Sequence, residues 1–391
     1  MDAITALTPI LINGLISRIY TPASAMQRHF GFEMGGKNVK RKATFAGAYT
    51  YDIFDKTRTA AKGVLRNAPA SSINRQPIGR NTVQLGESRE KLDLDYNEIN
   101  GLRQLGGPVG LFDPMGKDYI EKQLSYLRQR QDNFREFMLG GVLRGGRFGF
   151  KAVGQELFPS YDFANCFVQV DLKVPATHRM DGASYAAAVT AGGLTMGTGA
   201  NLIDTTWSDP AANVLGNMDK VSAAFQGTVG SPLAEMLMSS NTFNNLLNNT
   251  GIIKQAGSSS TAFVSYDQIA ETTEDGRKTG VRKATLKARQ WIEITIYDGQ
   301  IVIETNDTAT RVLPDGYVTF LSEGMPGEAL QLIEGTLVIK ENDIAAPREI
   351  VGFDSWKMER ADPARVELHT AMICGFELNR PSGIAWARVH D

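Results

Sequence analysis

The sequence is poor in the residues that most often mark a disulfide framework or a metal centre. Its 391 residues include only two cysteines, Cys166 and Cys374, and four histidines, at positions 29, 178, 369 and 390. The cysteines form no CxxC pair, and the histidines have no HExxH or HxH spacing. A disulfide scaffold is therefore excluded, and the sequence predicts no metal ligands. The low cysteine usage fits a reducing compartment.

Signals for membrane insertion and for phosphate binding are also absent. The apolar stretch 3–20 has no basic segment before it and is interrupted by Pro9, Asn13 and Arg18, so it predicts neither a signal peptide nor a membrane span. The glycine-rich run 140–149 follows a predicted helix, whereas a phosphate loop follows a strand and opens a helix. With no GxSxG or GxxxxGK[ST] motif either, we predict no catalytic residues and no cofactor-binding residues.

The net charge is close to zero, but the charged residues are unevenly distributed along the chain. The chain has 41 Lys and Arg against 43 Asp and Glu, for a net charge of −2. Residues 1–91 contain 14 cationic and 6 anionic residues (+8), which leaves 27 and 37 (−10) for residues 92–391. The densest basic run, 37–42, fits either a nucleic-acid patch or a solvated, extended arm, and the second is favoured. The basic first part therefore predicts an arm that contacts a partner.

Carboxylates cluster at Asp93, Asp95 and Glu98, where alternate spacing would suit a hard cation. The segment has no central glycine and no closing glutamate at the required spacing, so an acidic, solvent-facing edge is favoured. The acidic body, without a helix-turn-helix or zinc finger pattern, also argues against sequence-specific reading of nucleic acid.

A long helix over residues 117–142 is the clearest predicted element. Asp113 and Pro114 suit its start, and glycines at 140–141 and 145–146 suit its end. Apolar residues recur at spacings of three and four, with Gln131 interrupting the stripe, at Ile120, Leu124, Leu127, Phe134, Met138 and Val142. The other faces carry Lys122, Arg128, Arg130, Asp132, Arg135 and Glu136. Roughly 25 residues make a helix about 38 Å long.

The remaining segments mix strand and helix patterns. Residues 46–105 look extended, with a half-covered strand over 85–96, and predict a loop or ribbon that lies on something else. The pattern of residues 148–174 predicts strands. Residues 183–199 are mostly small, which indicates a loop or close packing. Helices are predicted at 213–227 and at 232–250, the second capped by Ser231. Strands dominate 261–321, where Asp298-Gly299 predicts a hairpin that sets Ile294 opposite Ile303. Strands and turns follow to the C-terminus, with a turn at 362–363, so the class is α+β.

Several stretches together resemble the lambda-type major capsid protein E family of tailed phages, which has the Hong Kong 97-type capsid fold. They are residues 51–60 (YDIFDKTRTA), 64–69 (VLRNAP), 86–94 (GESREKLDL), 112–116 (FDPMG), the helix 119–142, 207–210 (WSDP) and 362–363 (DP). The resemblance extends from about residue 45 to the C-terminus. It implies an N-terminal arm (1–45), an extended loop (46–105), a peripheral domain (106–206 with its spine helix 117–142, and the returning β-segment 331–391) and an axial domain (207–330).

The resemblance also implies a function without catalytic residues. The chain is expected to be a major capsid protein that assembles with itself, as hexamers and pentamers, into an icosahedral shell around double-stranded DNA. Scaffold, portal and decoration proteins are expected partners, contact with the packaged DNA is expected to be nonspecific, and no membrane is involved. The protein would be made in the bacterial host cytoplasm and located in the virion capsid. Alternatives are an encapsulin-like shell, a phage tail component, or an enzyme that uses carboxylates of residues 207–330.

Overall fold

The computed structural model describes residues 25–33, 36–42, 47–54, 78–95, 114–154, 156–180, 206–255, 264–265, 281–286, 289–303, 308–325, 327–339, 348–361 and 364–389. It divides into two compact units. The first draws on residues 1–49, 84–138 and 332–376, and the second on 50–83, 139–331 and 377–391. Both units combine helices and strands, which confirms the predicted α+β class. The small-residue stretch 183–199 lies outside the described residues.

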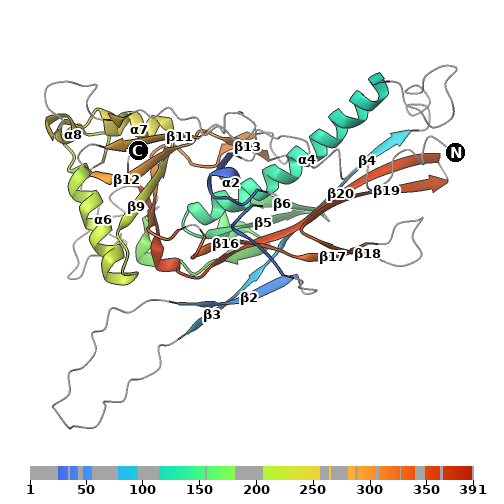
Figure 1. Ribbon diagram of the computed structural model, residues 1–391, viewed down its shortest axis with the longest axis horizontal. Coiled ribbons are helices and arrows are strands. Elements are labelled where there is room, and N and C mark those ends of the chain that lie inside the picture. The colour runs from blue at the N-terminus through green and yellow to red at the C-terminus, as the bar shows by residue number, and fades with distance from the viewer. Residues whose placement is uncertain are drawn as a thin grey trace, which may run out of the picture. The chain divides into compact units, whose positions relative to one another are not determined.

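The first unit contains most of the long helix α4, Pro114–Leu143, as predicted for 117–142. Its apolar stripe is buried at Ile120, Leu124 and Leu127. The helix packs on strand β20, Ala364–Leu378, where Gln131 Nε2 lies 3.5 Å from Thr370 Oγ1 (Figure 1).

Strand β20 is the centre of the first unit's sheet. The strand order is β1-β16-β20-β19, and β4 also pairs with β20. The other strands are β1 (Val39–Arg41), β4 (Gly86–Asp95), β16 (Leu330–Glu334) and β19 (Phe353–Ala361). Ala361 of β19 pairs with Ala364 of β20, and residues 362–363, where the sequence predicts a turn, lie outside the described residues. A further hairpin, β17 (Thr336–Ile339) with β18 (Arg348–Val351), places Leu337 and Ile339 in a core cluster with Trp356.

Part of the predicted N-terminal arm belongs to this unit. The short helix α2, Ala25–His29, and the residues after it bury Met26, Phe30 and Phe32. Strand β1 then pairs in parallel with β16, with Val39 opposite Leu332. Residues 25–33 and 36–41 therefore belong to the folded unit, and the basic run 37–42 contributes an edge strand, with Lys37, Arg41 and Lys42 exposed to solvent.

The polar faces of α4 are largely buried. Arg128, Asp132, Arg135 and Glu136 are each at most 7% exposed. The α2 segment (residues 25–33) covers part of this face: Gln27 Nε2 donates to the Asp132 carbonyl (2.8 Å), and Glu136 Oε1 accepts from the Met26 N–H (3.1 Å).

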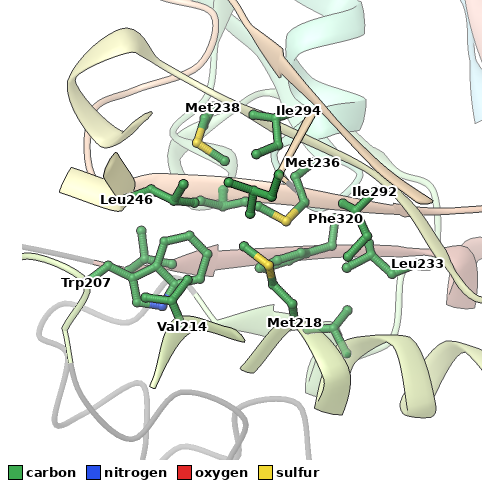
Figure 2. Close-up of a cluster of buried hydrophobic side chains, with 14 of the residues drawn as sticks. Trp207, Val214, Met218, Leu233, Met236, Met238, Leu246, Ile292, Ile294 and Phe320 are labelled. Atoms are coloured by element: carbon green, nitrogen blue, oxygen red, sulfur yellow. The ribbon is translucent and has the colours of Figure 1, made fainter. Parts of the chain in front are cut away.

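The second unit contains a seven-stranded sheet with the order β10-β11-β12-β9-β15-β21-β8. These strands are β8 (Arg179–Met180), β9 (Leu233–Met238), β10 (Val264–Ser265), β11 (Arg282–Leu286), β12 (Arg289–Ile296), β15 (Tyr317–Ser322) and β21 (Ile384–Arg388). The unit's helices are α6 (Val214–Thr228), α7 (Ser240–Leu247) and α8 (Thr250–Gln255). Trp207, Met218, Met236 and Phe320 meet in the buried cluster that α6, α7 and the sheet share (Figure 2).

Smaller sheets complete the second unit. Strands β5 (Arg147–Val153), β6 (Glu156–Ser160) and β7 (Val168–Asp171) form a three-stranded sheet, as predicted for 148–174. Strands β13 (Gln300–Ile303) and β14 (Thr308–Arg311) form a hairpin. Strands β2 (Ala48–Ile53) and β3 (Gly79–Gln84), within the range predicted to be extended, form a two-stranded ribbon. Single 3-10 turns lie at Phe163–Asn165, Ala176–His178 and Pro381–Gly383.

Two sequence predictions in this unit are wrong. The segment 232–250 is not one helix: it is strand β9 followed by α7, whose N-cap is Ser239 rather than Ser231. The predicted 298–299 hairpin does not form either, because β12 pairs with β11 and β9, whereas β13 pairs with β14. Ile294 thus lies opposite Ala284 and Met236, not Ile303. Met236, Leu237 and Met238 of β9 are all buried although neighbouring strand residues point to opposite faces, so this apolar run lacks the two-residue period that would separate it from a helix.

Candidate functional site

The three histidine side chains that the structure describes make packing and polar contacts with neighbouring residues. His178 is buried, with Nδ1 3.0 Å from the Ile384 carbonyl oxygen. The ring of His369 stacks on Trp356, with 5.3 Å between the ring centres. His29 packs edge-on against Phe30, and the histidine at 390 lies outside the described residues. Within the described ranges, no group of three or more His, Cys, Asp or Glu side chains could hold a metal ion.

The acidic cluster expected at 93–98 is part of a charge network on the first unit's sheet. Asp93 in β4 lies 3.3 Å from Lys91 and 3.7 Å from Arg365. Both cations also reach the buried carboxylate of Glu367, at 3.4 and 2.9 Å, and His369 Nε2 lies 3.0 Å from it. Two of these pairs, Lys91 with Glu367 and Arg365 with Asp93, cross from β4 to β20, so at Asp93 the charges make a polar sheet surface rather than a cation loop. Residue 95 ends β4, and residue 98 lies outside the described residues.

The glycine-rich run 140–149 is the exit of α4, as its position after a helix predicts. Gly145 and Gly146 have φ values of +85° and +72°, which L side chains rarely adopt. A Cβ on Gly146 would lie 2.7 Å from Val174 Cγ2, so the turn also needs a residue without a side chain. The chain then enters β5 at Arg147, and the run has the geometry of a helix-to-strand turn.

The two cysteines are structural. Burial raises the pKa of the Cys374 thiol to about 12, so this thiol stays protonated at neutral pH. Burial also raises the pKa of Cys166. Because the thiolate is the reactive form, neither residue has the character of a nucleophile.

The basic residues of segment 277–289 that the structure describes are paired with carboxylates of the second unit. Arg282 reaches Asp298 at 3.1 Å, and Lys283 reaches Glu293 at 2.6 Å. Arg289 contacts both carboxylate oxygens of Asp219. These cations are therefore compensated within the chain. Among the described residues, no helix is long and apolar enough to cross a membrane.

Strands β2 and β3 form a ribbon only two strands wide, which side-chain hydrogen bonds of Asn81 anchor to the rest of the unit. Asn81 Nδ2 donates to the Tyr51 hydroxyl (3.0 Å) and to the Asp171 carbonyl (3.1 Å). Burial raises the pKa of Tyr51. Towards the segment 55–77, outside the described residues, Phe54 and Ile78 are 47% and 59% exposed. A two-stranded ribbon is at best marginally stable alone, so these apolar side chains suit contact with another surface.

Exposed apolar side chains also gather on the sheet of β5, β6 and β7, which the sequence did not single out. Val153 and Leu157 are about half exposed, and Phe167, just before β7, is 78% exposed. In the sequence these residues do not differ from Phe148 and Phe150, which are buried in the same sheet. The exposed residues differ from the buried ones only in position: they lie where the sheet extends beyond the hydrophobic core.

The described residues thus include a two-stranded ribbon and strands with exposed apolar side chains, which suit contact with another chain. The model of the family described as phage major capsid protein E matches residues 198–374. This part of the chain is therefore similar to that family, in agreement with the resemblance predicted from the sequence. No curated protein matches the sequence.

Solved structures of phage-related proteins are similar over most of the chain. A putative capsid protein of a prophage from E. coli CFT073 is 14% identical, with 80% of this chain and 79% of that chain covered and a TM-score of 0.44. A phage-related protein from Bordetella bronchiseptica RB50 is 8% identical (97% and 95% covered, TM-score 0.47). The capsid of Ralstonia phage GP4 is 11% identical (92% and 89% covered, TM-score 0.44). At these values the likenesses carry no conclusion by themselves, and the family match carries the assignment.

Proposed function

We propose that this chain is the major capsid protein of a tailed phage and assembles with itself into the icosahedral shell that encloses the double-stranded DNA genome. The observation that carries the proposal is the match of residues 198–374 to the phage major capsid protein E family. The proposal assigns the chain a structural role in the virion capsid and no catalytic one.

The physical basis of assembly is burial at many repeated contacts. One copy leaves apolar side chains such as Phe54 and Ile78 partly exposed on a two-stranded ribbon. Covering them removes apolar surface from water, which stabilises a contact by about 25 cal/mol per Å² before the cost of ordering is subtracted. Because each copy both offers and covers such surfaces, a closed shell leaves few of them exposed.

We extend the proposal to the parts of the chain and to its partners. Residues 1–45 would be the arm, 46–105 the extended loop, 106–206 and 331–391 the peripheral domain, and 207–330 the axial domain. Hexamers and pentamers of the chain would form the shell, with scaffold, portal and decoration proteins as further partners. Contact with packaged DNA would be nonspecific, and synthesis would take place in the bacterial host cytoplasm.

Electron microscopy of the purified full-length chain tests the proposal. We expect closed icosahedral shells at concentrations above an assembly threshold. Tubes or small rings would indicate a tail component instead and would contradict the proposal. A monodisperse monomer that hydrolyses a substrate would contradict it as well. Shells that enclose a cargo protein rather than DNA after assembly in cells would indicate an encapsulin-like compartment.

A further inference from the structure

The first part of the chain that the structure describes contacts the first unit at both of its ends. We refer to residues 25–33 and 36–42, which contain α2 and β1, as the strap. At one end, the Met26 N–H donates to Glu136 Oε1 of α4 at 3.1 Å, where α2 lies beside α4 (Figure 1). At the other end, the three residues of β1 pair in parallel with β16. The strap therefore connects the long helix to the sheet of the same unit.

Aromatic packing and a buried cation hold the middle of the strap. Phe32 is fully buried, and its ring packs edge-on against Phe376 of β20, with 5.5 Å between the ring centres. Arg135 of α4 is also buried, with its guanidinium 3.4 Å from Gln27 Oε1 and 3.3 Å from the Phe32 carbonyl oxygen. Opening the strap would expose the aromatic ring to water and break these contacts, so the closed strap is favoured.

An ion pair closes the strap at β1. Arg41 Nε lies 3.1 Å from Glu334 Oε2, and the Glu334 side chain is only 3% exposed. The backbone at Gly352 covers the same carboxylate, since a Cβ there would lie 2.6 Å from Glu334 Cδ. Taking a cation away from a buried carboxylate is costly, because the remaining charge is poorly solvated. Glu334 therefore favours the closed strap as well.

The chain that leaves the strap returns to the same unit after a few residues. The Gly47 carbonyl accepts from the Leu85 N–H at 2.8 Å, and both residues belong to the first unit. Five peptide units join Lys42 to Gly47 and span at most about 18 Å. A strap that closed on another copy would need the β16 of that copy within this reach. The strap of another copy would make identical contacts, so the covalent connection, which raises the effective concentration of the chain's own strap, decides between them.

We propose that the strap stays closed on its own unit when the shell forms and is not exchanged between copies. This inference rests on the proposed function and narrows it, because an arm that contacts other copies is then confined to residues before 25. The polar face of α4 that the strap covers is likewise excluded as a contact surface between copies. The family match does not bear on the strap, since it begins at residue 198.

A disulfide lock tests whether the strap has to open. Arg41 and Glu334 are cross-strand partners, and neighbouring strands lie about 4.8 Å apart, which suits a disulfide between Arg41→Cys and Glu334→Cys. The full-length double variant is oxidised before assembly, and the same protein kept reduced is the matched control. We expect their assembly thresholds to agree within about twofold, because locking a state that is kept throughout shifts no equilibrium. A threshold that oxidation raises beyond about twofold overturns the inference.

Co-assembly of the two single variants detects exchange directly. Copies with only Arg41→Cys are mixed with copies with only Glu334→Cys, assembled under reducing conditions and then oxidised within the shell. Closed straps keep these thiols on different copies apart, so we expect no more covalent dimers than in shells of the unsubstituted chain, whose two cysteines are buried. Covalent dimers above that background overturn the inference.

Hydrogen exchange on the unsubstituted chain makes the test independent of substitutions. The Met26 N–H donates to Glu136 Oε1, and the Leu332 N–H donates to the Asn38 carbonyl at 3.2 Å, so both amides report on the closed strap. We expect both to stay protected in short deuterium pulses taken throughout assembly. Loss of their protection while shells form overturns the inference and leaves the proposed function intact. Failure of the unsubstituted chain to form shells contradicts the proposed function, and this inference with it.

Discussion

Arg135 is a single side chain on which the packing of the first unit depends. It is 1% exposed, and its guanidinium lies 3.4 Å from Gln27 Oε1, 3.3 Å from the Phe32 carbonyl oxygen and 3.2 Å from Met372 Sδ. Arg135→Met keeps most of the volume but leaves two buried oxygen acceptors without this donor. We therefore expect the free energy of unfolding to fall by about 2–4 kcal/mol.

The matched control for this substitution is Arg130→Met in the same helix. Arg130 pairs with Glu90 (2.7 Å) near the surface, where such pairs contribute about 1 kcal/mol or less. Urea unfolding of the unassembled variants gives both values. A loss for Arg135→Met that is no larger than the loss for Arg130→Met would show that the buried guanidinium does not hold this core together.

At the residue scale, the burial of Arg135 is a feature that the sequence does not predict. The spacing of Ile120, Leu124 and Leu127 correctly predicted the apolar stripe of α4, because 3.6-residue periodicity is local. Charged residues such as Arg135 and Glu136 are seldom fully buried unless they have partners. Their partners come from residues 26, 27 and 32, more than a hundred positions away, and no periodicity within the helix contains that information.

At the scale of elements, the α2 segment and β1 are a structural part of the first unit. Val39, Lys40 and Arg41 pair with β16, and Arg41 Nε lies 3.1 Å from Glu334 Oε2. Lys40→Pro removes a backbone N–H and fixes φ at the centre of this three-residue strand. We expect β1 to detach, and trypsin to cleave after Lys37 and Arg41 at least about tenfold faster than in the unsubstituted chain.

Lys40→Ala is the control for this experiment, because it removes the same charge and keeps the N–H. It should be cleaved at the rate of the unsubstituted chain at both positions. If the proline and alanine variants are cleaved equally fast, β1 is not held by its pairing with β16, and residues 25–41 behave as the free arm that the sequence suggested.

Elements were predicted correctly where the local sequence pattern determines the conformation, and wrongly where pairing with distant strands determines it. As predicted for a strand with one covered face, the even-numbered residues of β4 are the covered ones, with Leu94 buried. The sequence of β9 favours a helix, because Leu and Met are good helix formers and its leucines and methionines are all buried. Its strand conformation comes from β12 and β15 on its two sides, which are distant in the sequence.

At the scale of the whole molecule, the uneven charge is partly neutralised within each copy. Several cations of residues 1–91 pair with carboxylates of the same chain: Arg41 with Glu334, Arg80 with Asp52, Arg89 with Glu87, and Lys91 with Glu367. Two of these carboxylates, Glu334 and Glu367, belong to the acidic body. The attraction between the basic part of one copy and the acidic body of the next is therefore weaker than the totals of +8 and −10 indicate.

Salt should consequently slow the assembly of the shell more than it reduces the final yield. Charge complementarity mainly orients and accelerates encounters, and the Debye length falls from about 14 Å at about 0.05 M to about 4 Å at about 0.5 M NaCl. We expect the initial rate of assembly, followed by light scattering, to fall about three- to tenfold over this range. The final yield above the threshold should change by less than about twofold, because apolar burial is not screened by salt. A yield that falls in parallel with the rate would show that ion pairs between copies, rather than buried apolar surface, stabilise the shell.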